Sequence, residues 1–231
     1  MARRRRRVGS FALAVVAARN EEDRIAATVA ALLSIPGVGA VIVADDGSTD
    51  RTAERATDAG ARVVGGPAIG KGGSVERALD AAPDARTYVL ADGDLGASAV
   101  GLAPLLDAVE PGDVDLAVGV LPPPPTGGFG LVKSFAASLV ARVAGPRPVE
   151  PLSGQRVVTR ACLWACRPLA RGFGMESAMT ADALRLGFGV AEIPVTAEHR
   201  FTRRNAAGFL HRASQGLDIA RAMAPRLVGV R

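Results

Sequence analysis

Two clusters of carboxylates each follow a short apolar run of β type. Residues 45–50 read Asp-Asp-Gly-Ser-Thr-Asp after the run 41–44, and residues 92–94 read Asp-Gly-Asp after the run 87–90. Open α/β sheets bind their ligands at the carboxyl ends of parallel strands. One cluster is suited to hydrogen-bonding a ribose or a base, and the other to holding a hard divalent cation against a diphosphate. The two clusters together indicate an enzyme that acts on nucleotide sugars.

Asp92 and Asp94 form the candidate metal-binding pair. Alternate residues that leave a strand point the same way, so both carboxylates can face one ion and its diphosphate. Ligands that are all oxygen favour Mg²⁺ or Mn²⁺, and such ions usually retain waters and substrate phosphates. The alternative interpretation is an ordinary Asp-Gly turn that binds nothing.

Three further residues are expected to contact the nucleotide sugar. Glu21 follows the first apolar run and is suited to accepting hydrogen bonds from a ribose or uracil, while Asp46 is expected to contact the base or ribose. Lys71 stands between glycines at a helix start, where backbone N–H groups and an ammonium can both meet phosphate or a nucleotide edge. Structural alternatives exist, because a first-turn glutamate is favoured by the helix dipole, a lysine can be solvated in a turn and Asp50 can cap a helix.

The elements that must position these residues alternate between strand and helix. This alternation predicts an α/β fold with a mainly parallel central sheet flanked by helices. Strands are expected at residues 11–17, 39–44, 62–64, 87–90, 115–120, 152–159 and 190–195, and helices at 21–34, 50–59, 70–82, 98–109, 131–143, 175–186 and 207–223.

The size and composition of the chain suit one globular domain. It has 231 residues, of which 48% are hydrophobic. Residues 9–231 are expected to form a single domain, in which a Pro- and Gly-rich stretch at 121–130 divides a nucleotide-sugar-binding half (9–120) from an acceptor-facing half (121–231). No stretch approaches the ~20 apolar residues of a membrane span. The arginines at 3–7 and the apolar run 8–18 resemble a secretory signal, but we interpret that run as the first strand and therefore expect a cytoplasmic protein.

The net charge of +5 is concentrated at the amino terminus. Arg3 to Arg7 supply five positive charges, so the remainder of the chain balances to zero. A nucleic-acid-binding protein carries its excess charge on the folded body, and this function is therefore not expected. Residues 1–8 are interpreted as a disordered basic tail, or alternatively as a peripheral contact with anionic lipid.

The motifs resemble a known enzyme family when they are taken in order. Residues 18–22 (Ala-Arg-Asn-Glu-Glu), 45–50, 70–72 (Gly-Lys-Gly) and 92–94 are similar to the motifs of family-two glycosyltransferases of the GT-A fold. The resemblance implies a metal-dependent transferase that uses a nucleotide-diphosphate sugar, most simply one linked to UDP, with Mg²⁺ or Mn²⁺. It also places Ala18, Arg19 and Gly93 in the donor site.

The second half is more loosely similar to bacterial glucosyl-3-phosphoglycerate synthases. Residues 151–156, 171–176 and a basic segment that contains His199 carry this likeness. It implies that Asp94 is the direct metal ligand and His199 a further one, with Asp92 nearer the ribose or a metal-bound water.

The same likeness suggests residues for the acceptor side. Glu176 is the candidate that deprotonates an acceptor hydroxyl or helps to place the donor sugar, although a glutamate at a helix start also has a structural explanation. Ser153, Gly154 and Arg156 are candidates for an anionic acceptor, because guanidinium groups suit carboxylate and phosphate. The acceptor itself is expected to be a small anionic molecule or a polyprenyl phosphate.

Two other functions remain open at this point. A nucleotidyltransferase acting on a sugar phosphate would use a related sheet, but it normally carries a glycine-rich loop directly after its first strand, where this chain has Ala18-Arg19-Asn20. A non-catalytic protein that binds nucleotide sugars is the second alternative, because function lies in the site and not in the fold. The alanine-rich helix at 131–143 is also suited to packing against a second copy in a homodimer.

Overall fold

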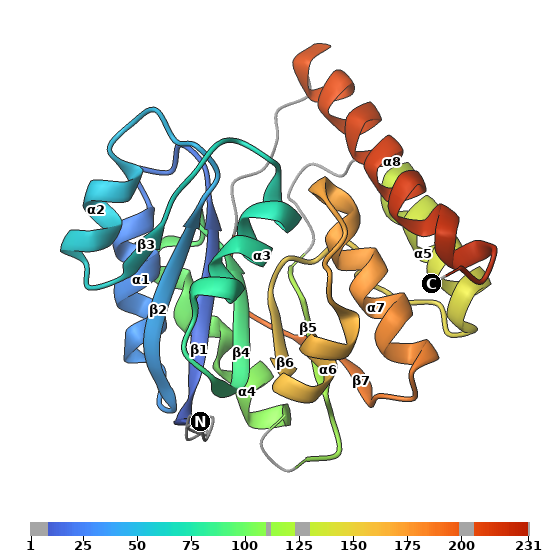
Figure 1. Ribbon diagram of the computed structural model, residues 1–231, viewed down its shortest axis with the longest axis horizontal. Helices are drawn as coiled ribbons and strands as arrows, with labels where there is room; N and C mark the ends of the chain where they lie inside the picture. Colours follow the sequence, from blue (N-terminus) through green and yellow to red (C-terminus); the bar gives the residue numbers. More distant parts are fainter. Residues whose placement is uncertain (1–8, 110–111, 123–129, 199–205, 231) are drawn as a thin grey trace, which may run out of the picture.

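The computed structural model describes residues 9–109, 112–122, 130–198 and 206–230. Its strands form one sheet in the order β3-β2-β1-β4-β6-β5-β7, with helices against both faces (Figure 1). The strands are β1 (Gly9–Ala18), β2 (Val38–Asp45), β3 (Arg62–Val64), β4 (Ala85–Asp92), β5 (Leu116–Val120), β6 (Arg156–Thr159) and β7 (Val190–Pro194). The helices are α1 (Ile25–Ser34), α2 (Thr52–Asp58), α3 (Lys71–Ala81), α4 (Ala103–Val109), α5 (Leu131–Ala144), α6 (Arg160–Cys166), α7 (Met175–Arg185) and α8 (Ala206–Leu227), with 3₁₀ turns η1 (Gly96–Leu102) and η2 (Gly172–Gly174).

The sheet confirms the predicted α/β architecture and differs from the sequence expectation at one strand. Of the described strands only β6 runs antiparallel to its neighbours, β4 and β5. The strand expected at 152–159 begins only at Arg156, because residues 152–155 form a loop that crosses the edge of the sheet. The single helix expected at 98–109 is a 3₁₀ turn followed by a short α-helix.

Apolar side chains alternate between the two faces of the strands and form a core on each face. Val16, Val43 and Val89 pack with α1, α2, η1 and α4, whereas Leu13 and Leu90 pack with α3, α6 and α7. A third cluster joins α7 to the outer pair α5 and α8 (Figure 1). Within the described residues no helix has the length and apolar character needed to cross a membrane.

Strand β1 brings the two acidic clusters to the same edge of the sheet. Its last residue, Ala18, is paired in register with Asp45 of β2, and Ala17 is paired with Asp92 of β4. Because all three strands are parallel, their carboxyl ends lie side by side, and the residues that follow Asp45 and Asp92 enter adjacent loops. The parallel arrangement therefore produces the convergence that the sequence predicted.

Helix α8 is anchored to α7 by a buried ion pair. Arg226 Nε donates to Asp182 Oδ1 at 2.7 Å, and its Nη2 donates to the second carboxylate oxygen. The two residues are 4% and 6% exposed, so both charges are removed from water. Ile219 and Met223 add apolar contacts with α5 and α7 on the same side of α8.

We expect Arg226→Met to destabilise the protein by about 3–5 kcal/mol, because it removes the guanidinium that both oxygens of the buried Asp182 carboxylate accept from. Urea unfolding followed by the fluorescence of Trp164, the chain's one tryptophan, would measure the loss. Adding Asp182→Leu to the same chain should restore most of the stability, since both buried charges are then gone. A single variant within ~1 kcal/mol of the wild type would contradict this role for the pair.

Candidate functional site

A lysine between two carboxylates forms the centre of the candidate site. Lys71 Nζ lies 2.5 Å from Asp92 Oδ1 and 2.6 Å from Glu176 Oε1. The three side chains come from the start of α3, the end of β4 and the first turn of α7. Burial alone would lower the pKa of the Lys71 ammonium, but the two carboxylates outweigh that effect and raise it well above its usual value. Lys71 is therefore a fixed positive charge at the carboxyl edge of the sheet.

Gln155 and Gly154 hold Asp92 from the other side. Gln155 Nε2 donates to Asp92 Oδ2 at 2.7 Å, and its Oε1 accepts from the Asp92 amide at 3.2 Å. A Cβ at Gly154 would stand only 2.5 Å from Asp92 Oδ2 and would also overlap Lys71 Nζ. Glycine at this position leaves room for the Lys71 and Asp92 side chains to meet as they do here. Gln155 was not among the predicted site residues; its place directly after Ser153 and Gly154 is the signal that could have indicated it.

Arg156 is buried in the core and is not exposed at the surface, where it could contact a ligand. Its side chain is fully buried, with Nε donating to Ser153 O at 2.8 Å and Nη1 donating to Thr180 Oγ1 at 2.9 Å. Burial lowers the pKa of Arg156 to about 10, against the opposing effect of the nearby Glu176 carboxylate. The guanidinium stays charged at neutral pH, and direct contact with an acceptor would require the chain around it to move.

The residues on either side of Asp92 are tied to β1 and α1. The Gly93 amide donates to Ala17 O at 2.9 Å, and Gly93 O accepts from Thr28 Oγ1 at 2.9 Å. The backbone carbonyl of Asp94 accepts from Arg24 Nη1 at 2.9 Å, and its side chain is half-buried. These bonds hold the Asp-Gly-Asp segment against the end of β1.

Asp46 joins the second acidic cluster to the loop that enters α3. Its amide donates to Ala18 O at 3.0 Å, and its carboxylate accepts from the amides of Ile69 at 2.8 Å and Gly70 at 3.1 Å. The side chain is 7% exposed. Asp46 therefore fixes the backbone immediately before Lys71, and its predicted contact with a base stays a prediction.

Hydrogen bonds connect the loops after β1 and β2. The Glu21 amide donates to Thr52 Oγ1 at 2.8 Å, and the Glu22 amide donates to Asp50 Oδ2 at 3.2 Å. Burial raises the pKa of Asp50, but hydrogen bonds from Thr52 and Glu22 outweigh it, so the net shift is downward. Asp50 acts as a structural residue at the start of α2, as its alternative interpretation proposed. Arg19 is exposed at this edge of the sheet.

The chemistry of the available ligands fits a hard cation. Asp92 and Asp94 supply only oxygen, and Mg²⁺ or Mn²⁺ commonly binds through one or two carboxylates with phosphate oxygens and waters completing the shell. His199, the further ligand that the resemblance implies, lies outside the described residues, as do Arg3 to Arg7. In the described ranges no cluster of three or more histidine, cysteine, aspartate or glutamate side chains is placed to hold an ion.

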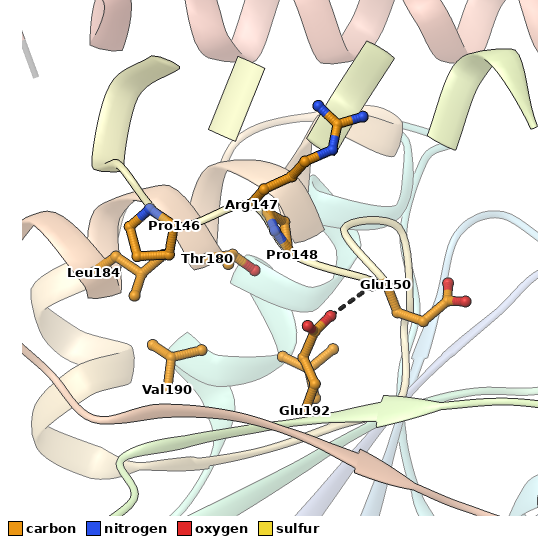
Figure 2. Close-up of a pocket in the computed structure, with 9 residues that line it drawn as sticks. Pro146, Arg147, Pro148, Glu150, Thr180, Leu184, Val190 and Glu192 are labelled. Atoms are coloured by element: carbon orange, nitrogen blue, oxygen red, sulfur yellow. Dashed lines mark hydrogen bonds between the residues drawn. The ribbon is translucent and has the colours of Figure 1, made fainter. Parts of the chain in front are cut away.

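Two cavities lie beside the loop at 146–150, in the second half of the chain. The smaller, of about 120 Å³, is bounded by β5, β7 and α7, and Figure 2 shows Glu192 pointing from its floor toward the loop. Glu192 accepts hydrogen bonds there from the amides of Val149 and Glu150 at 2.8 and 2.5 Å. This volume is well below the ~300 Å³ of a typical ligand pocket. A molecule of nucleotide size does not fit in this cavity as it stands.

The larger cavity, of about 350 Å³, lies between the same loop and the first turns of α5, and it carries two cations. Lys133 is paired with Glu150, whereas the Arg147 guanidinium donates to Ser138 Oγ at 2.7 Å and Ser134 Oγ at 3.0 Å. Figure 2 shows the Arg147 guanidinium turned away from the smaller cavity. The loop continues past both cavities to Gly154, and so connects them to the Lys71 cluster.

Comparison with known proteins identifies relatives of both halves. Residues 13–144 match the model of glycosyl transferase family 2. Glycosyltransferase AglJ of Haloferax volcanii is 29% identical over 164 residues, which are 69% of this chain and 54% of that protein. The chain thus spans about half the length of this curated relative.

Solved structures resemble nearly the whole chain. A mycobacterial protein has a TM-score of 0.80 at 28% identity, covering 95% of this chain and 75% of the other. Glucosyl-3-phosphoglycerate synthase from Mycobacterium tuberculosis, solved with Mn²⁺, UDP and phosphoglyceric acid, has a TM-score of 0.78 at 26% identity, covering 95% of this chain and 79% of the other. The likeness therefore includes the half beyond residue 144 that the family model leaves out.

We expect Gly154→Ala to separate Lys71 from Asp92, because the new methyl group would occupy the space of the ion pair. The chain has two lysines, so the rate of Lys71 acetylation relative to Lys133 can be measured by mass spectrometry. The ratio should rise about tenfold, the equivalent of ~1.4 kcal/mol in protection.

Gly216→Ala is the matched control. Its added methyl group enters open space on helix α8, and alanine is the better helix former. It should leave the Lys71 acetylation ratio unchanged. An equal ratio in Gly154→Ala and the wild type would show that Gly154 does not confine the pair.

Proposed function

The chain belongs to glycosyl transferase family 2, and from this we propose that it moves a sugar from a nucleotide-diphosphate sugar, with UDP as the nucleotide, to an acceptor hydroxyl or phosphate. The observation that carries the proposal is the cluster of Lys71, Asp92 and Glu176 at the carboxyl edge of the sheet. Ligands of open α/β sheets bind at this edge. Lys71 and Asp92 belong to the segment that matches the family, whereas Glu176 lies beyond it.

We assign the donor to the loops that follow β1, β2 and β4. Ala18, Arg19, Glu21 and Asp46 border the proposed nucleoside site, and Lys71, Asp92 and Gly93 border the proposed site of the diphosphate and sugar. The relative from M. tuberculosis was solved with UDP and Mn²⁺, which supports the same ligand classes here.

We propose that Asp94 is the direct ligand of Mg²⁺ or Mn²⁺. The Asp92 carboxylate is engaged by Lys71 and Gln155, so it is better placed to orient the ribose or a bound water than to turn wholly toward an ion. His199 remains the proposed further ligand. When bound, the cation would supply positive charge near the leaving diphosphate, which is the usual role of metals in such transfers.

Residues of the chain itself would carry the rest of the catalysis. The Lys71 ammonium is held rigidly by two carboxylates, and a preorganised charge of this kind can stabilise negative charge that develops on a leaving group. Glu176 is 3% exposed and faces Lys71 from the acceptor-facing half. We propose that its carboxylate orients the donor sugar or the incoming hydroxyl, since both would reach the cluster from this side.

For the acceptor we favour a small anionic molecule bound near the larger cavity. Lys133 and Arg147 line that cavity, and Ser153 and Gly154 lie where the same loop meets Asp92. The M. tuberculosis relative was solved with phosphoglyceric acid, an acceptor of this class by charge. Arg156 would contribute from its buried position, where its positive charge lies close to the Glu176 carboxylate.

The two alternative functions predict different products. A nucleotidyltransferase would release pyrophosphate, and the non-glycine segment 18–20 after β1 argues against it. A non-catalytic protein would bind nucleotide sugars without turnover against any acceptor. Four further expectations remain proposals: a polyprenyl phosphate acceptor, contact of Arg3 to Arg7 with a membrane, a cytoplasmic location and self-association through α5.

The face of α5 that carries Ala136 and Val140 already packs against α7 and α8 within this chain.

We expect Asp94→Asn to remove the metal-dependent part of UDP binding. A ligand at a hundred times its Kd stabilises the native state by ~2.7 kcal/mol, so UDP with Mn²⁺ should raise the melting temperature of the wild type. The variant should show only the smaller shift that UDP causes alone. Asp107→Asn, at an exposed position of α4, is the control and should match the wild type. A full Mn²⁺-dependent shift in Asp94→Asn would contradict the assignment.

We expect Arg147→Ala to raise the KM for an anionic acceptor about tenfold, because a hydrogen bond to a charged group contributes ~1.5–3 kcal/mol. Slow hydrolysis of the UDP-sugar without acceptor should not change, since Arg147 lies away from the donor loops. Arg142→Ala removes an exposed cation near the end of α5 and should leave both rates unaltered. Equal acceptor KM values for Arg147→Ala and Arg142→Ala would place the acceptor elsewhere.

A further inference from the structure

Helix α8 contacts the turn from which α7 begins, although it lies in the outer layer (Figure 1). The Asp218 carboxylate of α8 accepts a hydrogen bond from the Phe173 amide at 3.3 Å. Gly172 has a φ of +59°, and a Cβ there would stand 2.9 Å from Asp218 Cγ and overlap Oδ2. The carboxylate therefore occupies the space that any other residue at position 172 would fill. Asp218 therefore contacts the turn η2 both at Gly172 and at the Phe173 amide.

The same turn is packed against α3 without intervening side chains. A Cβ at Gly72, in the first turn of α3, would stand 2.9 Å from the carbonyl carbon of Ala170 and overlap its oxygen. The backbone of residues 170–172 thus lies directly on the start of α3, where Lys71 is the first helical residue. A displacement of the turn would be transmitted to Lys71 because no flexible side chain separates the two backbones.

The turn also determines where Glu176 is placed. Gly174 is the N-cap of α7, and Glu176 is the second residue of that helix. A Cβ at Gly174 would stand 2.7 Å from the Asp218 carbonyl oxygen, so the backbone of α8 confines the turn at its other end as well. Both ends of the Lys71–Glu176 ion pair therefore start from elements that contact the turn held by Asp218.

We propose that Asp218 is a positioning residue for the Lys71–Glu176 pair, acting through the Gly172–Gly174 turn. This inference rests on the proposed function, because it assigns Asp218 an effect on sugar transfer that is exerted through Glu176. The Asp218 carboxylate accepts a hydrogen bond from the backbone of the turn, which precedes Glu176. It shapes the site without contacting the substrate.

The test is a double-mutant cycle between Asp218→Ala and Glu176→Gln. Asp218→Ala should lower kcat for transfer from the UDP-sugar about tenfold, the effect of one net hydrogen bond, with the Kd for UDP unchanged. In a Glu176→Gln background the same substitution should change kcat less than twofold, since coupled residues are not additive. Asp218→Asn, which keeps an oxygen that can accept from Phe173, should restore kcat to near the wild-type value. Equal losses in both backgrounds would overturn the proposal.

A second readout does not depend on catalysis. Asp218→Ala should raise the acetylation of Lys71 relative to Lys133 about fivefold, because the ion pair is loosened, which corresponds to ~1 kcal/mol. Arg221→Ala removes the exposed partner of Asp218 on the same helix and should leave the ratio unchanged. If Asp218→Ala does not fold, Asp218→Ser, whose hydroxyl is too short to reach Phe173, is measured instead.

The two readouts separate failure of this inference from failure of the proposed function. An unchanged acetylation ratio in the truncated variant would overturn the positioning role even if transfer activity is found. A raised acetylation ratio in Asp218→Ala, together with no transfer by the wild type from any nucleotide sugar, would overturn the proposed function and the expected effect on kcat. The structural coupling of Asp218 to Lys71 would still stand.

Discussion

The site depends on one ammonium group that is shared by two carboxylates. Asp92 and Glu176 both lie within 2.6 Å of Lys71 Nζ, so without that cation two negative charges would face each other in a partly desolvated space. Removing such a charge from a buried cluster is costly because the remaining charges lose their compensation. The ion pairs therefore connect α3, β4 and α7, three elements that are far apart in the chain. The relative positions of Asp92 and Glu176 at the carboxyl edge of the sheet are those at which both carboxylates can pair with Lys71.

Sequence could predict how the acidic clusters converge, because the rule behind it is local and periodic. Apolar runs ended at Asp45 and Asp92, and parallel pairing with β1 then had to bring these ends to one edge. The partners of Asp92 could not be predicted in this way. Gln155 reaches Asp92 because β6 is antiparallel, so that the amino end of this strand, paired at Arg156 with Leu90, lies at the functional edge. The direction of a strand depends on the connection that leads into it and on packing across the whole sheet. The residue types at 152–159 therefore do not reveal whether this strand is parallel or antiparallel.

Arg156 shows why residue type alone misleads at the boundary between site and core. An arginine after Ser-Gly-Gln is typical of an anion-binding loop, yet it is the first residue of β6 and its side chain lies on the same face as Val158, within the core under α7. Ser153 O and Thr180 Oγ1 compensate it there, and its positive charge remains close to Glu176. Glu176 is consequently held between the Lys71 ammonium and the Arg156 guanidinium, and these two charges limit its movement.

The residues of the Lys71 cluster are divided between the segment that matches the family and the part of the chain that follows it. The family match ends at residue 144, and it includes Lys71, Asp92 and Asp94 but neither Gln155 nor Glu176. A chain with only the matched segment would carry the lysine with one of its two carboxylates and without the amide that orients Asp92. The second half therefore completes the electrostatics of the first half as well as lining the cavities beside residues 146–150. Variation in that half can change the two cavities, whereas Gly154 is confined by the side chains of Lys71 and Asp92, and the turn at 172–174 by the side chain and backbone of Asp218. Those positions limit how far residues 121–231 can diverge while the ion pairs persist.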